Sequence, residues 1–136
     1  MIEANEWRRY SSQLKLEVPA IISEIEACER ELHLALPLEY KEFLMKTNGA
    51  EGPIGEHSYA MFWRVSELSK LNEAYQVPIC APGYLLFGSD GGGEAFAFEV
   101  ARNMAICSLP FVGMSGDAAA SMGATFWMFL ETLWRQ

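Results

Sequence analysis

The sequence predicts an α+β fold in a single domain spanning residues 1–136, with helices first, then a meandering and mainly antiparallel sheet, then a C-terminal helix. Three observations lead to this expectation. A chain of 136 residues, of which 51% are hydrophobic, has material for one packed core. Residues 1–70 carry 12 acidic and 8 basic side chains, which indicates solvated helices. Residues 71–136 carry only 6 acidic and 2 basic side chains, which indicates strands and a buried last helix.

The first expected helix follows Pro19, which suits the first helical position because its missing N–H would be unpaired there. Its apolar face recurs at i, i+4, i+7 and i+11 and consists of Ile21, Ile25, Cys28 and Leu32. A second helix is expected from about Pro37, with one side made of Tyr40, Phe43, Leu44 and Thr47. Asn48 and Gly49 tolerate the left-handed backbone conformation, so they are predicted as the structural turn that ends this helix.

The strands are expected further along the chain. A strand over 60–65 leads into a short helix with Ser66 as its N-cap. Aromatic and branched side chains predict strands over 84–88 and 94–100, joined by a turn with positive φ at several positions. The structural residues of that turn are Gly91, Gly92 and Gly93.

The last part of the chain adds one more strand and a helix. Residues 104–109 are expected to form a strand that Pro110 stops. The uncharged residues 118–130 are expected to lie in a buried helix, whose apolar spacing is clearest at Phe126, Phe129, Leu130 and Leu133. In the strand over 94–100, Phe96 and Phe98 alternate with alanines, so one face of the sheet is expected to be aromatic.

Charge and cysteine usage limit the partners and the compartment. The formal net charge of −8 disfavours nucleic acid and anionic membranes, and leaves open a positively charged protein partner. The first ten residues lack the apolar core of a secretory signal, and no apolar run reaches the roughly 18 residues of a spanning helix. Three widely spaced cysteines without a CxxC motif fit free thiols in a reducing cytoplasm.

Four kinds of site can be weighed from residue types. A phosphate loop needs a following helix and usually a lysine, whereas the triple glycine leads into Glu94 and a strand, which favours a hairpin turn. Asp90 and Glu94 are too few for calcium, and a glycine-rich turn is too wet for acid–base work. They are expected to form an exposed acidic rim. The cysteines Cys28 and Cys107 lie in apolar patterns typical of packed thiols, and the two histidines form no zinc cluster. The chain is therefore expected to be no enzyme and to bind no metal or cofactor.

Three stretches of this sequence form a recognisable series: IISEIEACERELHLALPLEYKEFLMKTNG over residues 21–49, LFGSDGGGE over 86–94, and the aromatic helix over 126–133. In this order they resemble the SUKH superfamily, which contains the SMI/KNR-type regulators and bacterial immunity proteins. Together they cover most of residues 20–134 in the family's order, and residues 1–18 look like a variable extension. Two positions differ from the pattern: His33 stands where glycine is usual, and Glu99 stands where aspartate is common.

The resemblance implies a sheet flanked by helices that acts by binding other proteins, and bacterial members are usually inferred to neutralise a polymorphic toxin, often a nuclease. We therefore expect a cytoplasmic immunity protein whose acidic surface faces a basic toxin domain. The residues expected to pair with lysine or arginine on that partner are Asp90, Glu94, Glu51 and Glu56.

Two alternatives from other classes remain at this point. One is a regulatory scaffold that holds an endogenous protein, as the eukaryotic members of the superfamily do. The other is a small-molecule binding domain that uses the aromatic face of the sheet, which a large apolar pocket with converging polar groups would favour.

Overall fold

The computed structural model describes all 136 residues and contains six α-helices and one seven-stranded sheet. The helices are α1 (Ala4–Ser11), α2 (Ile22–Leu32), α3 (Leu38–Leu44), α4 (Leu68–Ala74), α5 (Val77–Cys80) and α6 (Phe126–Arg135). The strands are β1 (Lys15–Leu16), β2 (Ala50–Ile54), β3 (Ser58–Phe62), β4 (Tyr84–Ser89), β5 (Glu94–Glu99), β6 (Ala105–Pro110) and β7 (Ala120–Gly123). The predicted α+β class and the C-terminal helix are confirmed.

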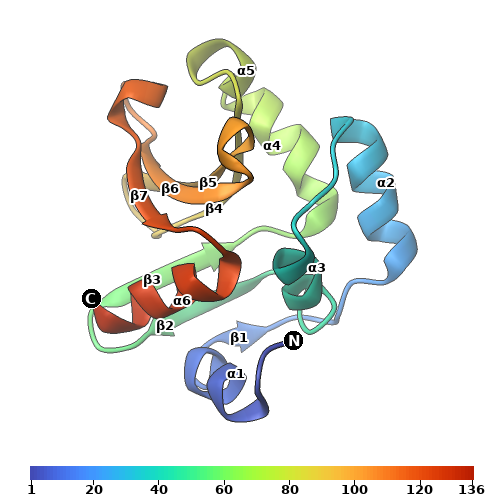
Figure 1. Cartoon of the computed structure of the whole chain (residues 1–136), viewed down its shortest axis with the longest axis vertical. Helices are drawn as coiled ribbons and strands as arrows, with labels where there is room; N and C mark the ends of the chain where they lie inside the picture. The colour runs from blue at the N-terminus through green and yellow to red at the C-terminus, as the bar shows by residue number, and fades with distance from the viewer.

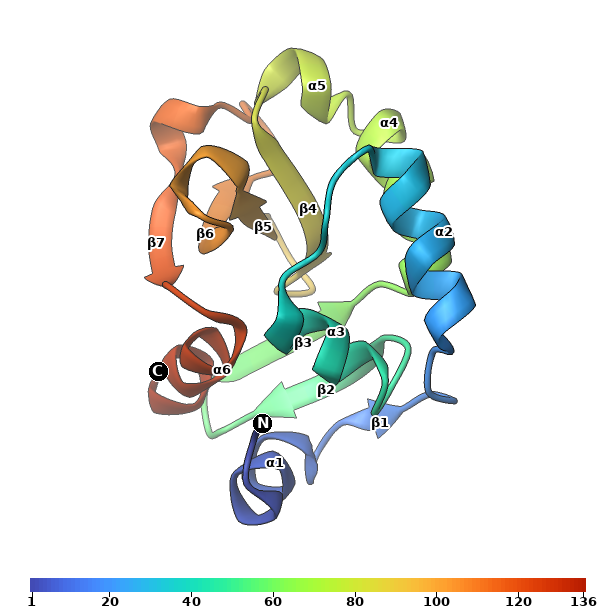
Figure 2. The same cartoon turned by 45° about the vertical axis from the view of Figure 1, so that its right-hand side comes forward.

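The sheet is a meander in which every strand pairs antiparallel with its neighbour in sequence, in the order β1 to β7. The pairing between β3 and β4 is short: only Met61 is opposite Ser89 and Phe62 opposite Gly88. At this join the sheet bends, so that β1–β3 and β4–β7 lie at an angle to each other (Figures 1 and 2). Helix α6 lies inside the bend and contacts β2, β3 and β7.

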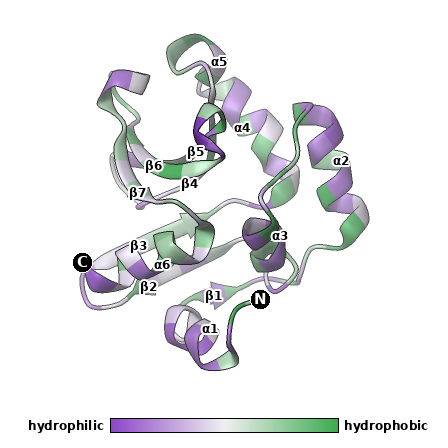
Figure 3. Cartoon of the chain, viewed as in Figure 1, coloured by the Kyte–Doolittle hydropathy of each residue, from purple (hydrophilic) through white to green (hydrophobic).

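The core sits between α6, α3 and the inner face of the bent sheet. Its largest side chains are fully buried aromatic rings, from α3 (Tyr40, Phe43), the sheet (Phe87, Phe96, Phe98) and α6 (Phe126, Phe129). The predicted aromatic face of β5 is therefore real, but it is covered by helices. A smaller apolar cluster lies on the other face of β4–β6 against α5. In Figure 3 hydrophilic residues are frequent on α1 and α2, which fits helices with one solvated side.

Residues 1–18 pack against the rest of the fold. The Tyr10 hydroxyl donates to Glu131 of α6 at 2.6 Å, and the Ile2 amide donates to Glu42 of α3 at 3.0 Å. The Trp7 ring meets Phe43 edge-on, with centroids 5.9 Å apart. The hydrogen bond from Tyr10 and the guanidinium of Arg135 lower the pKa of the Glu131 carboxyl. Helix α1 thus closes one side of the core, and neither α1 nor β1 was anticipated from the sequence.

Several predicted boundaries were wrong, each for a local reason. The uncharged stretch 118–130 is not one helix, because residues 120–123 form β7 and the Thr125 side chain caps α6 by accepting from the Met128 amide. The glycines and proline of residues 51–56 predict a loop, but Ala50–Ile54 form β2. Ser66 is not an N-cap, since the turn begins at Arg64, whose amide donates to Glu67. The strand expected over 60–65 spans Ser58–Phe62 instead.

The helix ends also differ from expectation. Pro19 lies before the helix, and α2 begins after Ile21, whose amide donates to Glu24 at 3.0 Å. Helix α3 ends at Leu44, and the Asn48 side chain instead accepts a hydrogen bond from the Val65 amide. His33 adopts the left-handed conformation at the end of α2, with φ 56°. Histidine here takes the conformation for which glycine is the usual residue.

Candidate functional site

The four acidic residues proposed to contact a partner lie on two neighbouring hairpins. Glu51 belongs to β2 and Glu56 to the β2–β3 turn, while Asp90 and Glu94 flank the β4–β5 turn. Because Met61 pairs with Ser89 in antiparallel register, the β4–β5 turn continues beside the start of β3, at the same end as the β2–β3 turn. Both turns lie on the side of the molecule where the C-terminus ends (Figure 1). The register therefore brings Glu56, Asp90 and Glu94 to one end of the sheet, which we call the acidic end, while Glu51 lies further along β2, opposite Met61.

Tyr59 of β3 connects the two hairpins. Its hydroxyl donates to Glu51 at 2.6 Å, and this hydrogen bond raises the pKa of the phenol. Its ring lies against Gly91, so close that a Cβ there would come within 2.9 Å of Cδ1. Asp90 and Glu94 meet Tyr59 and His57 at a depression of about 330 Å³. The depression is completed by Ser58, Phe96, Ser108, Met122, Leu133 and Gln136.

The four carboxylates differ in how far they are already engaged. Asp90 accepts the amides of Gly92 at 2.8 Å and Glu94 at 3.2 Å, so it holds its own turn. Glu51 is engaged by Tyr59. The carboxylate of Glu94 accepts no hydrogen bond within the chain, and Glu56 has only the exposed His57 ring 3.8 Å away. Glu94 and Glu56 are therefore the acids with most capacity for a partner, and Asp90 has a structural role.

The triple glycine forms a hairpin turn, as the sequence predicts, but its backbone is less unusual than expected. Only Gly91 has a left-handed φ, at 81°, while Gly92 and Gly93 do not. The Asp90 amide donates to the Glu94 carbonyl and closes the turn at 3.0 Å. The turn leads into a strand, where no helix N-terminus could hold a phosphate.

A model of the SMI1 / KNR4 family (SUKH-1) matches residues 19–132. The chain belongs to this family. The comparison with curated proteins found no match. The SUKH-1 match starts at residue 19, so α1 and β1 lie outside it although they pack on the SUKH-1 core.

Other kinds of site find little support in this SUKH-1 domain. The aromatic face of the sheet, considered above for a small molecule, is filled by α3 and α6, with Phe87 and Phe98 fully buried. The structure gathers no group of three or more histidine, cysteine, aspartate or glutamate side chains that could hold a metal ion. None of its helices has the length and apolar character to cross a membrane.

The thiols give a direct check on the burial in this structure. Burial raises the pKa of Cys28 and of Cys107 to about 11, so both are protonated at neutral pH, whereas Cys80 is exposed on α5. We expect one thiol per chain to react rapidly with a chromogenic disulfide reagent in the native state and three after denaturation. A Cys80→Ser variant should lose the rapid reaction. Rapid reaction of two or three thiols in the native protein would contradict the packing described here.

Sequence reasoning missed two features of the surface. Tyr59, which links Glu51 to the β4–β5 turn, could be found only from the strand register. The second feature is a set of exposed apolar residues on α2 and α3, among them Ile22 and Leu38. A signal for these was present, because Leu38, Lys41, Glu42 and Met45 stand at i, i+3, i+4 and i+7, opposite the buried side of α3.

Proposed function

We propose that this SUKH-1 domain is a cytoplasmic immunity protein that binds a cognate toxin domain with a basic surface, with no chemistry of its own. The observation that carries the proposal is the position of Glu56, Asp90 and Glu94 at one end of the sheet, with Glu51 joined to that end through Tyr59, in a chain of net charge −8. Membership of the family supports a protein as the partner.

A nuclease toxin is the class of partner that this charge distribution suits best. Nucleases carry lysine and arginine to hold phosphates, and an acidic protein can occupy that surface. Complementary charge also speeds association, because long-range attraction steers the partners together. Glu94 and Glu56 are expected to form ion pairs with the toxin, while Tyr59 and the depression beside it offer an amphipathic contact.

The test is to co-express the chain with the toxin-like product of the adjacent gene and to measure survival, complex formation and salt dependence. The double variant Glu56→Lys/Glu94→Lys is expected to weaken binding on the order of a hundredfold, mainly through a slower association rate, and to abolish protection. The matched control is Glu31→Lys/Glu73→Lys, which reverses two charges as well, at exposed acids on α2 and α4 away from both turns (Figure 1).

Three results would count against the immunity function. One is the absence of a toxin-like neighbouring gene, and another is a lack of protection when the pair is co-expressed. The third is equal weakening by Glu31→Lys/Glu73→Lys, which would mean that net charge and not the acidic end drives binding. An isolated housekeeping locus would instead favour the regulatory scaffold.

A further inference from the structure

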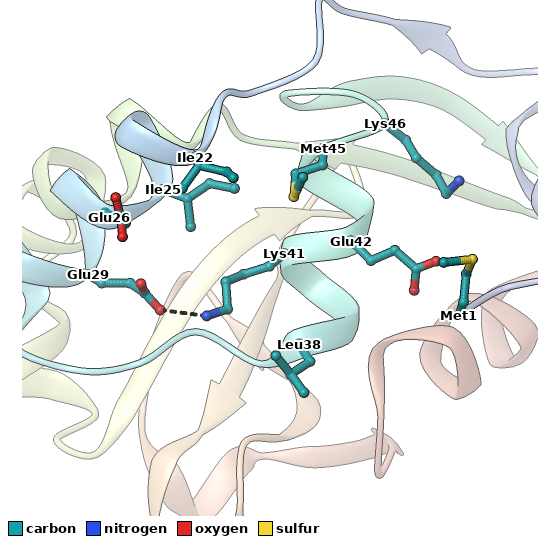
Figure 4. Close-up of a pocket in the computed structure, with 10 residues that line it drawn as sticks. All are labelled: Met1, Ile22, Ile25, Glu26, Glu29, Leu38, Lys41, Glu42, Met45 and Lys46. Carbon is teal, nitrogen blue, oxygen red and sulfur yellow. Dashed lines mark ion pairs between the residues drawn. The ribbon is translucent and has the colours of Figure 1, made fainter.

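Helices α2 and α3 form a groove on the side of the molecule away from the acidic end (Figure 4). Its volume is about 540 Å³. Each helix lines the groove with side chains spaced at i, i+3, i+4 and i+7, and the last of these on the α3 side belongs to the residue that follows the helix. These side chains are Ile22, Ile25, Glu26 and Glu29 on the α2 side, and Leu38, Lys41, Glu42 and Met45 on the α3 side. Met1 and Lys46 complete the lining.

The groove exposes large apolar side chains that nothing in the fold covers. Leu38 is 81% exposed, Ile22 59% and Met45 49%. The first turn of α2, which contains Ile22, is coloured as hydrophobic in Figure 3, in contrast to the hydrophilic far end of the helix. Adjoining exposed apolar residues of this size on the surface of a small domain are typical of an interaction site.

The charged side chains of the groove are engaged within the chain, with one exception. Lys41 pairs with Glu29 at 3.2 Å, as the dashed line in Figure 4 marks, and Lys46 lies over the Trp7 ring at 5.6 Å. Glu42 accepts hydrogen bonds from the Ile2 amide and from the Trp127 indole at 3.0 and 3.2 Å. The carboxylate of Glu26 has neither an ion pair nor a hydrogen bond and is exposed.

These contacts decide between kinds of occupant. A bound strand would gain nothing from the groove walls, because their backbone groups are already paired within α2 and α3. An anion is disfavoured, since the lining carries the carboxylates of Glu26, Glu29 and Glu42 against two lysines, of which Lys41 is already paired. Two helical walls with Leu, Ile and flexible Met side chains suit the apolar face of another helix. The free carboxylate of Glu26 suits a lysine or arginine beside that face.

We propose that the α2–α3 groove binds an amphipathic helix of a partner protein, with apolar side chains at i, i+3 or i+4, and i+7, and a basic residue placed against Glu26. The 11-residue α2 is roughly 16 Å long, which matches about three turns of such a helix. This is a second surface, separate from the acidic end, and it does not depend on the partner being a toxin.

The experiment selects binders to the full chain from a displayed library of helical peptides with randomised surface positions. Selected peptides are expected to share the apolar helical spacing and at least one basic residue. In fluorescence anisotropy with the best peptide, Leu38→Glu and, on the opposite wall, Ile22→Glu should each weaken binding on the order of thirtyfold or more. Glu26→Gln should weaken it a few-fold and reduce its salt dependence.

Two controls make the outcome decisive. Val112→Glu places a charge at another highly exposed apolar residue and should leave binding unchanged, and circular dichroism confirms that each variant is folded. Glu56→Lys/Glu94→Lys should also leave peptide binding intact, which separates this proposal from the immunity function. A selection that yields no binders sensitive to Leu38→Glu and Ile22→Glu, or that yields peptides without helical apolar spacing, overturns the proposal.

Discussion

Replacing Phe87 with alanine is expected to lower the free energy of unfolding by about 3–5 kcal/mol, measured by urea denaturation. The Phe87 side chain is fully buried in β4 at the centre of the aromatic core. Its ring lies 4.4 Å from that of Phe98 and 5.6 Å from that of Phe129, so it joins the sheet to α6. Truncation would leave a cavity between the sheet and α6. A loss of this size approaches the whole stability of many small domains.

The control for this prediction is Phe111→Ala. Phe111 is half-buried and packs against Tyr75 outside the main core, with ring centroids 4.9 Å apart. Its truncation should cost less than half as much as that of Phe87. If Phe87→Ala does not fold, Phe87→Leu keeps most of the volume and should lose about 1.5 kcal/mol. Equal urea midpoints for Phe87→Ala and Phe111→Ala would contradict the central place of Phe87.

The strands around Phe87 show what the sequence could predict. The ends of β4 and β5 were predicted to within one residue, because aromatic and branched side chains flank a glycine-rich turn. This pattern is typical of a β-hairpin. The pairing was not predictable in detail. Leu86 pairs with Ala97 and Gly88 with Phe96, so Phe87 is an extra residue in a bulge. No local sequence pattern predicts this bulge. It lies in β4, the strand that pairs with β3 where the sheet bends.

Strand β2 shows why glycine and proline misled the prediction. Gly52 and Pro53 read as a loop because both residues are rare in strands. In the structure Gly52 is opposite Ala60, and the chain at Gln13 passes so close that a Cβ on Gly52 would lie 2.6 Å from the Gln13 carbonyl. Glycine is required here for the approach of a distant segment, which depends on tertiary structure. Local propensity gives no access to such contacts.

The acidic end was predictable as a set of residue types but not as a surface. Glu51 and Glu94 are far apart in sequence, and only the pairing of Met61 with Ser89 brings their hairpins together. The hydrogen bonds that Asp90 accepts from the amides of Gly92 and Glu94 depend on the geometry of its own turn.

The α2–α3 groove was missed for a different reason. The apolar face expected for α2 did not include Ile22, and within that face Ile25 and Cys28 are buried while Ile21 is exposed.

Replacing Gly49 with alanine is expected to lower the free energy of unfolding by about 3 kcal/mol, although the change adds one methyl group. Gly49 has φ 92°, a conformation that strains any residue with a side chain. A Cβ here would lie 2.8 Å from the Phe62 carbonyl oxygen and 3.3 Å from the Arg64 amide, both of them backbone atoms. Neither atom can move without disturbing the end of β3. Urea denaturation measures the loss as a lower midpoint at unchanged slope.

The matched control is Gly93→Ala in the β4–β5 turn. Gly93 lies outside the left-handed region, and no atom beyond its chain neighbours comes within 4 Å of a Cβ built there. Alanine at this position should change stability by less than about 0.5 kcal/mol. Both glycines lie in stretches that resemble the family pattern. The comparison of the two variants therefore shows at which position the backbone conformation and packing require glycine. If the two variants unfold at the same urea concentration, the close packing of residue 49 against β3 is wrong.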